Sequence, residues 1–112
     1  MIADLKEEQQ GDVYILRIKG RLDAVSAPIA EKKIFESIKR SEYKILIDMS
    51  GVNYLSSAGM RMLLSTTKRL RALSGKLYLS NLSVEVLDVL KMSGFDHILD
   101  VFSTEQDAFR QF

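Results

Sequence analysis

Hydrophobic and polar positions along the chain follow two different periods, which predicts strands separated by helices. Short apolar runs rich in β-branched and aromatic residues indicate buried strands. The predicted strands are Asp4–Gln9, Val13–Gly20, Tyr43–Ser50, Lys76–Asn81 and Ile98–Phe102. The first of these has a weak pattern and is followed by the turn residues Gln10, Gly11 and Asp12. We therefore expect the first two strands to form an antiparallel hairpin.

Apolar residues at helical spacing predict four helices, and the one that follows Gly59 has the clearest pattern. Its apolar positions are Met60, Leu63, Leu64, Leu70 and Leu73. The dipeptide Ser74–Gly75 is expected to end this helix, since glycine is common just beyond a helix C-terminus.

Hydroxyl side chains are expected to begin the other three helices. Ser26 is a candidate N-cap, with Pro28 in the first turn, where a missing N–H costs nothing. The face of this helix toward the core is expected to carry Ile29, Phe35 and Ile38. Ser83 is the candidate N-cap of the third helix. Ser103 and Gln106 are expected to form a capping box at the start of the last helix.

This order of elements predicts an α/β fold in a single domain over residues 1–112. Strands separated by helices imply parallel pairing with right-handed crossovers. We expect a mixed, mostly parallel sheet of four to five strands packed with four α-helices. Loops at the carboxyl ends of parallel strands are the usual functional edge. A loop after Asp48 is expected to lead to Ser56 and Ser57, which places both serines at that edge.

Charge and composition narrow the classes of function. The chain has 16 basic and 15 acidic residues and a formal net charge of +1. This balance argues against direct nucleic-acid binding, which favours a basic face. No apolar run approaches the roughly 20 residues that span a bilayer, and the first ten residues lack an apolar signal core. We therefore expect a cytoplasmic protein without a nucleic-acid or membrane partner.

Catalytic and metal-binding patterns are poorly represented. The chain has no cysteine and one histidine, His97, whose neighbours do not suggest a catalytic triad. Carboxylates are scattered without metal-ligand spacing, and the GxxxxGK[ST] phosphate loop is absent. We expect no catalytic residue, no metal and no cofactor.

The stretch Ser56-Ser57-Ala58-Gly59 joins a predicted strand to the clearest helix, and it has two interpretations. In the structural one, a serine hydroxyl caps the helix, which is worth about 1 kcal/mol, and the small residues permit close packing. In the functional one, a serine is phosphorylated, because a helix N-terminus tolerates phosphate. Arg61, four residues after Ser57, can then pair with the phosphate. Neighbouring apolar residues, either core or part of an exposed patch, are Val52, Tyr54, Leu55 and Met60.

The chain resembles the bacterial anti-sigma-factor antagonists, the stand-alone STAS domains. Three segments carry the resemblance: GRLDAVSAP (Gly20–Pro28), ILIDMSGVNYLSSAGMRMLL (Ile45–Leu64) and VLKMSGFDHIL (Val89–Leu99). The middle segment is the specific one. The resemblance in segment order covers roughly Val13 to Phe112.

This resemblance implies a partner switch. Members bind an anti-sigma factor that is also a serine kinase, and binding frees the sigma factor. The kinase phosphorylates one serine of the antagonist and so ejects it, and a PP2C-type phosphatase restores it. Ser57 takes the phosphorylated position, and Ser56, the second choice, stands where the family usually has an acid. The implied partner-binding residues are Asp23, Ser56, Ser57, Ala58, Gly59, Met60 and Arg61.

A second possibility is a STAS scaffold that is not phosphorylated. Examples are the small cytoplasmic subunit of a lipid-transport ABC system and a component of a stress-signalling assembly. In such a protein the two serines only cap the helix and allow close packing. An enzyme on this fold is disfavoured, because histidine, cysteine and clustered acids are scarce.

Overall fold

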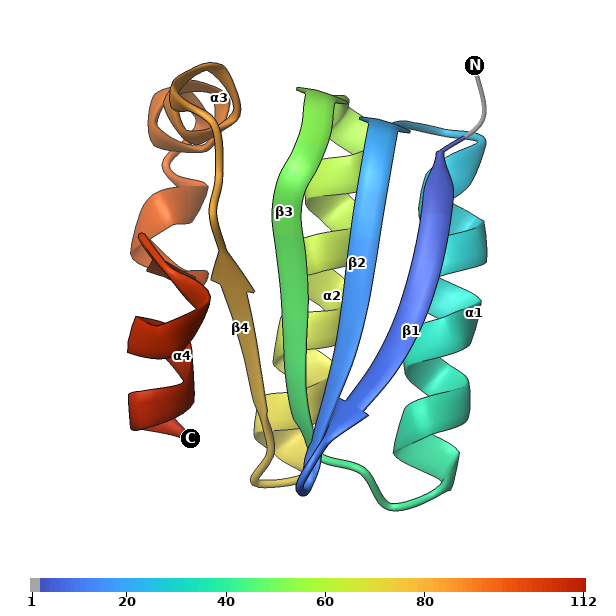
Figure 1. The fold of residues 1–112 in the computed structure, drawn as a ribbon. Helices are drawn as coiled ribbons and strands as arrows, with labels where there is room; N and C mark the ends of the chain where they lie inside the picture. Colours follow the sequence, from blue (N-terminus) through green and yellow to red (C-terminus); the bar gives the residue numbers. More distant parts are fainter. Residues whose placement is uncertain (1–2) are drawn as a thin grey trace.

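Within residues 3–112, which the computed structural model describes, five strands form one sheet that packs with four α-helices (Figure 1). The strands are β1 (Asp4–Gln10), β2 (Val13–Leu22), β3 (Lys44–Leu55), β4 (Lys76–Ser80) and β5 (Asp100–Phe102). The helices are α1 (Ser26–Lys39), α2 (Ser57–Ala72), α3 (Val84–Ser93) and α4 (Glu105–Gln111), with a 3₁₀ turn at Phe95–His97. The predicted α/β class and mixed sheet are confirmed.

The strands lie in the order β1-β2-β3-β4-β5. The β1–β2 pair is antiparallel and the other three pairs are parallel, as the strand–helix alternation predicts. The tight turn between β1 and β2 contains Gly11 at a φ of 60°, a conformation that favours glycine. Leu22 and Leu55 are register partners, so β2 and β3 end side by side.

The two faces of the sheet are covered differently. Helices α1 and α2 lie side by side on one face, and α4 lies on the other (Figure 1). The larger core, between the sheet and α1, α2 and α3, includes Leu16, Ile18, Ile34, Ile45, Ile47, Leu63, Leu70, Leu77 and Leu90. The smaller core under α4 contains Val13, Ile15, Leu46, Tyr78 and Ala108. Most of the buried apolar surface therefore lies against α1, α2 and α3.

Two expectations about the junctions with α1 and α2 are wrong. Strand β3 continues without a loop after Asp48 and runs 12 residues to Leu55, because its last part pairs with Gly20 and Leu22 of β2. Ser26 is the first residue of α1 rather than its N-cap, and its hydroxyl accepts a hydrogen bond from Asp23 N–H, outside the helix, at 3.0 Å. Val25 occupies the N-cap position, and the Asp23 carboxylate accepts hydrogen bonds from the N–H groups of Val25 and Ser26, as the next section describes.

Smaller corrections concern helix faces and ends. Ile29 is 44% exposed, whereas Ile38 is buried as predicted. The left-handed residue after α2 is Ser74 (φ 59°), and Gly75 is needed for space instead, because a Cβ there would lie 2.6 Å from Tyr43 O.

The N-cap of α4 is Thr104, which accepts a hydrogen bond from Asp107 N–H at 3.1 Å. The capping box predicted with Ser103 and Gln106 is therefore wrong by one residue.

Other helix ends confirm their local signals. Ser83 caps α3 and accepts a hydrogen bond from Val86 N–H at 3.2 Å. Gly94, in the left-handed conformation at a φ of 79°, ends the same helix. Among residues 3–112, no helix has both the length and the apolar character needed to cross a bilayer.

Candidate functional site

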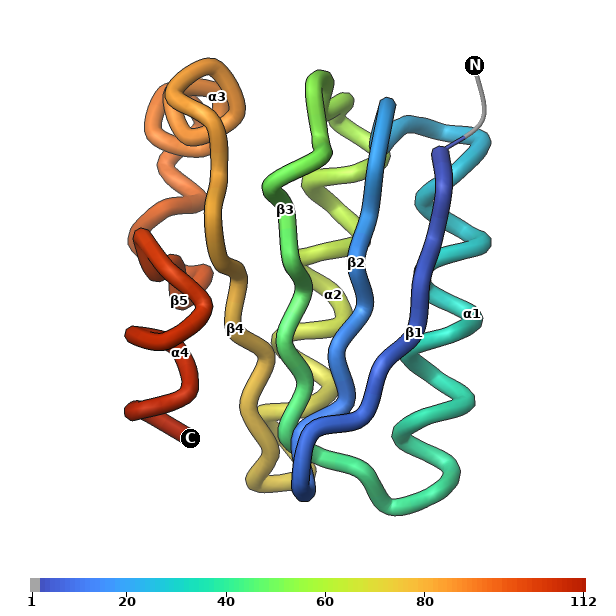
Figure 2. The backbone as a smooth tube through the Cα atoms, viewed as in Figure 1, coloured from blue at the N-terminus to red at the C-terminus, as the bar shows by residue number. Residues whose placement is uncertain are grey.

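The candidate site lies where the carboxyl ends of β2 and β3 meet the starts of α1 and α2. The backbone tube shows these two junctions next to each other at the upper edge of the sheet (Figure 2). Ser56 N–H donates a hydrogen bond to Leu22 O at 3.0 Å, which joins the two junctions directly. The turn that contains Asp23 and the start of α2 are therefore neighbours in space, although more than 30 residues separate them in sequence.

Ser56 is the N-cap of α2. Its backbone is extended (φ −87°, ψ 172°), and its Oγ accepts a hydrogen bond from Gly59 N–H at 3.2 Å. Its carbonyl accepts the first helical hydrogen bond, from Met60 N–H at 2.9 Å. The capping interpretation of the serine pair therefore applies to Ser56.

Ser57 is the first residue of α2, and its side chain is exposed. The first turn of α2 contains no acidic residue, so the partial positive charge of the helix N-terminus is not offset locally. Arg61 is exposed one turn further along the same helix. The hydroxyl of Ser57 is thus accessible at a helix N-terminus, whose partial positive charge favours a negative group.

Gly59 permits a close contact between α2 and the end of β2. A Cβ at this position would lie 2.5 Å from Leu22 O and 2.8 Å from Leu55 Cδ1. The carbonyl of Leu22 is the same group that accepts the hydrogen bond from Ser56. The smallest side chain is therefore required where the helix start docks on the sheet.

Asp23 organises the turn beside the serines. Its Oδ1 accepts hydrogen bonds from Ser26 N–H at 3.1 Å and Val25 N–H at 3.0 Å, and these two bonds hold the pKa of its carboxyl below the usual value. Arg21 Nε lies 3.5 Å from Asp23 Oδ2. The Ser26 hydroxyl in turn accepts a hydrogen bond from Asp23 N–H at 3.0 Å and donates to Arg21 O at 2.6 Å. Asp23 is thus an ionised group fixed at the edge of the site.

The surface around the serines is partly apolar. Val25 is 64% exposed and Tyr54 is 43% exposed, and the guanidinium of Arg21 lies 3.9 Å from the Tyr54 ring centroid. Val52 and Leu55 are buried in the core, so of the four apolar candidates only Tyr54 and the half-buried Met60 reach the surface. The sequence prediction missed Val25, although its place in the turn after Asp23 indicates exposure.

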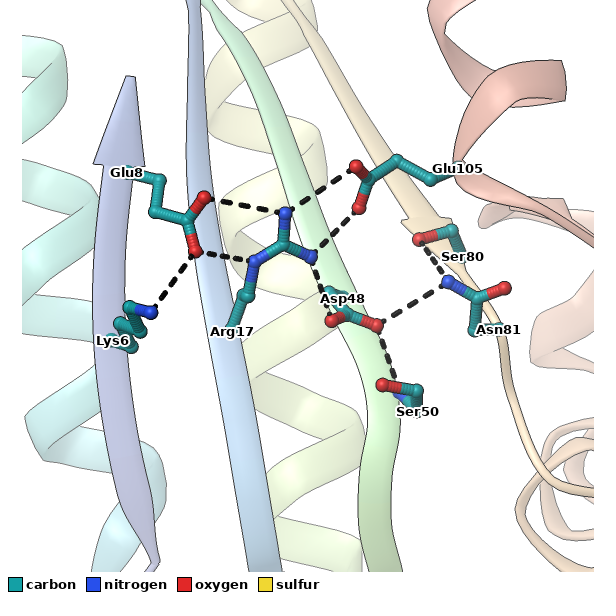
Figure 3. A network of polar contacts seen from close by, with 8 residues as sticks. All are labelled: Lys6, Glu8, Arg17, Asp48, Ser50, Ser80, Asn81 and Glu105. Atoms are coloured by element: carbon teal, nitrogen blue, oxygen red, sulfur yellow. Dashed lines mark hydrogen bonds and ion pairs between the residues drawn. The ribbon is translucent and has the colours of Figure 1, made fainter. Parts of the chain in front are cut away.

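A second polar cluster, also missed from the sequence, lies on the other face of the sheet (Figure 3). Arg17 bridges Glu8 of β1, Asp48 of β3 and Glu105 of α4 at N–O distances of 2.6, 2.9 and 2.8 Å. Burial raises the pKa of the Asp48 carboxyl, but hydrogen bonds from Ser50, Arg17 and neighbouring groups outweigh this effect, so the pKa of Asp48 is lowered. The hydrogen bond from Arg17 likewise lowers the pKa of Glu8. This cluster ties β1 and α4 to the central strands.

Comparison with known proteins assigns the family. The family model described as the STAS domain matches residues 4–108 of this chain. BtrV of Bordetella bronchiseptica is 30% identical over 96 residues, which cover 86% of this chain and 83% of BtrV. The chain therefore belongs to the STAS domain family.

Two further proteins are similar to the chain over most of its length. The anti-sigma-B factor antagonist of Bacillus subtilis is 26% identical over 99 residues, 88% of each protein. The Bacillus cell fate determinant SpoIIAA, solved in its phosphorylated form, superposes with a TM-score of 0.74. That alignment covers 96% of this chain and 98% of SpoIIAA at 22% identity, so it speaks for the fold alone.

Proposed function

We propose that this protein is an anti-sigma factor antagonist that works by partner switching in the cytoplasm. The unphosphorylated form binds an anti-sigma factor that is also a serine kinase, and this releases the sigma factor. Phosphorylation at Ser57 abolishes the binding, and a PP2C-type phosphatase restores it. The observation that carries the proposal is the exposed hydroxyl of Ser57 at the start of α2, beside a partly apolar surface.

The geometry favours Ser57 over Ser56 as the modified residue. The Ser56 side chain is half-buried and its oxygen already accepts the capping hydrogen bond from Gly59 N–H. A kinase that modified Ser56 would have to displace a cap worth about 1 kcal/mol. Ser57 is exposed and can be modified while this cap stays in place.

The effect of a phosphate follows from the surface that surrounds Ser57. The phosphate adds a charge of about −1.5 to −2 at the start of α2, and the hydrogen bond from Ser56 N–H to Leu22 O brings this start to the end of β2, which the turn with Asp23 and the exposed Val25 follows. A partner that buries this surface must desolvate that charge and accept its repulsion from Asp23. A penalty of about 3 kcal/mol weakens an affinity roughly a hundredfold, which is sufficient to exchange partners.

Two similar proteins support the proposed binding of an anti-sigma factor and the proposed phosphorylation. The Bacillus subtilis relative is named as an antagonist of an anti-sigma factor, and SpoIIAA exists in a phosphorylated form. The partner-binding residues that we propose are Asp23, Ser56, Ser57, Ala58, Gly59, Met60 and Arg61. Gly59 is buried, so its contribution is to position the helix start rather than to contact the partner.

The test is incubation of the protein with its anti-sigma factor kinase and ATP, followed by intact-mass and fragment-ion mass spectrometry. We expect one added phosphoryl group, located on Ser57. Ser57→Ala should gain none, whereas Ser56→Ala should still be modified. A phosphoryl group on Ser56 would contradict the assignment of the residue.

One set of contacts is also compatible with a different function. The cap by Ser56 and the packing of Gly59 explain these two residues of the stretch without any phosphate. They are equally expected in a STAS scaffold that is never phosphorylated, such as a subunit of a lipid-transport or stress-signalling assembly. No mass increase after incubation with an active kinase would favour this scaffold.

A further inference from the structure

A groove runs between α1 and α2, from the Ser57 end of α2 toward the far end of both helices. It consists of two adjoining hollows of about 310 and 520 Å³, and Pro28 and Glu31 line both of them. At their junction Ser65 donates a hydrogen bond to Glu31 at 3.3 Å, which connects the two helices. The second hollow extends to Lys39, at the end of α1.

The bottom of this α1–α2 groove is apolar. Ala27 and Met62 are only 3% and 5% exposed, and Phe35 is half-buried further along. Arg69 of α2 lies with its guanidinium 4.6 Å from the Phe35 ring centroid. The apolar groups are thus recessed between the helices rather than protruding from them.

Cations dominate the walls of the α1–α2 groove. The charged residues that line it are Lys32, Lys39, Arg61, Arg69, Glu31 and Glu36. Four cations against two carboxylates leave a charge of +2 in the groove, whereas the whole chain carries +1. Helix α2 itself contains four basic residues and no acidic one. A ligand that fits this groove should therefore be acidic.

The spacing of these cations matches a helix. Arg61 and Arg69 are eight residues apart on α2, and Lys32 and Lys39 are seven apart on α1. These separations correspond to about 12 and 10.5 Å, two helical turns on each wall. A helix laid between α1 and α2 would place carboxylates seven or eight residues apart opposite each pair, and an apolar stripe over the recessed floor.

We propose that the α1–α2 groove binds an acidic amphipathic helix of a partner protein. A membrane surface fits less well, because a bilayer is reached by protruding apolar side chains and this floor is recessed. The contact lies mainly beyond the Ser57 site and does not require phosphorylation. It extends the proposed partner surface along the length of both helices.

The test uses the full chain labelled with ¹⁵N and a designed helical peptide as probe. The peptide spans about four turns, with leucines in an i, i+3, i+7 stripe and glutamates at seven-residue spacing on both sides of the stripe. We expect saturable binding, with chemical-shift changes concentrated on residues of α1 and α2 that line the groove. Replacing the glutamates of the peptide by lysines should abolish the binding.

Charge-reversed variants locate the contact. The double variant Lys39→Glu/Arg69→Glu should bind the acidic peptide about tenfold more weakly, because two attractive contacts become repulsive. Lys68→Glu is the matched control, since Lys68 is exposed next to Arg69 on α2 but does not line the groove. It should change the affinity less than about twofold. Circular dichroism is used to check that each variant is folded.

Several results would overturn the proposal. These are absence of saturation, shift changes on other faces, equal binding of the lysine peptide, and an unchanged affinity of the double variant. Sedimentation with phosphatidylserine vesicles that depends on Lys39 and Arg69, in the absence of peptide binding, would indicate a lipid surface instead. Because the peptide has no kinase activity, none of these outcomes bears on phosphorylation of Ser57.

Discussion

The close packing of Gly59 leads to a prediction about stability. In Gly59→Ala, the new Cβ would lie 2.5 Å from the backbone carbonyl oxygen of Leu22 and 2.8 Å from Leu55 Cδ1. The carbonyl cannot rotate away as a side chain can, so the start of α2 has to move. This movement also lengthens the hydrogen bond from Ser56 N–H to the same oxygen, now 3.0 Å.

The expected cost combines three contributions. Overpacking of this kind costs about 2–3 kcal/mol, and weakening the hydrogen bond adds about 1 kcal/mol. Alanine is a better helix former than glycine, which returns about 1 kcal/mol. The free energy of unfolding of Gly59→Ala should therefore fall by about 2–3 kcal/mol, with a Tm lower by roughly 10 to 15 °C.

Urea denaturation followed by circular dichroism measures this change. Ser57→Ala is the matched control, because it lies in the same helical turn but is exposed. Its free energy of unfolding should stay within about 0.5 kcal/mol of wild type. If Gly59→Ala were as stable as wild type, the docking of α2 on the end of β2 would not depend on this contact.

Two other substitutions test the junction and the charged cluster. Ser56→Ala should lower the free energy of unfolding by about 1 kcal/mol in urea titrations, and Ser56→Asp should restore most of this loss. Equal stability of wild type and both variants would contradict the role of Ser56 as N-cap. Arg17→Met should cost about 2–3 kcal/mol at pH 7, less than for a fully buried pair, because Arg17 is 28% exposed. Since folding lowers the pKa of Asp48 and Glu8, their contribution is present at neutral pH and is lost below about pH 5. The difference in free energy of unfolding between wild type and Arg17→Met should therefore become smaller as the pH falls below about 5. A difference that stays constant from about pH 7 to pH 3 would contradict a stabilising role of the Arg17 ion pairs.

Local signals were sufficient for most of the fold. The β-branched runs gave the strands, and the spacing of Leu63 and Leu70 gave α2, because these positions face the core in the structure. Ser83 was predicted as a cap because it directly precedes an apolar helix. Such features depend on residues within one or two turns of one another.

Errors arose where two local solutions compete or where strand pairing extends an element. At the start of α1, Asp23 Oδ1 accepts a hydrogen bond from Ser26 N–H while Ser26 Oγ accepts one from Asp23 N–H, so Ser26 lies inside the helix and its hydroxyl points back to the preceding turn. Strand β3 passes Asp48 without a loop because β2 pairs with it as far as Leu55. Sequence periodicity does not contain this tertiary information.

The position of the candidate site was predicted better than its surroundings. The prediction that Ser56 and Ser57 lie at the carboxyl edge of the sheet is correct, although the expected loop does not exist. Arg17 bonds to residues 31 and 88 positions away, and no local pattern identifies these partners. The alternation of Val13, Ile15 and Arg17 along β2 indicates only that Arg17 shares a face with buried residues.

Equilibrium binding to the anti-sigma factor kinase tests the central claim most directly. Isothermal titration with wild type, Ser57→Ala and Ser57→Glu separates the hydroxyl from the charge at this position. We expect wild type and Ser57→Ala to bind equally, and Ser57→Glu to bind at least roughly tenfold more weakly, because one carboxylate carries less charge than a phosphate. Binding of Ser57→Glu with the affinity of wild type would contradict a switch at the start of α2.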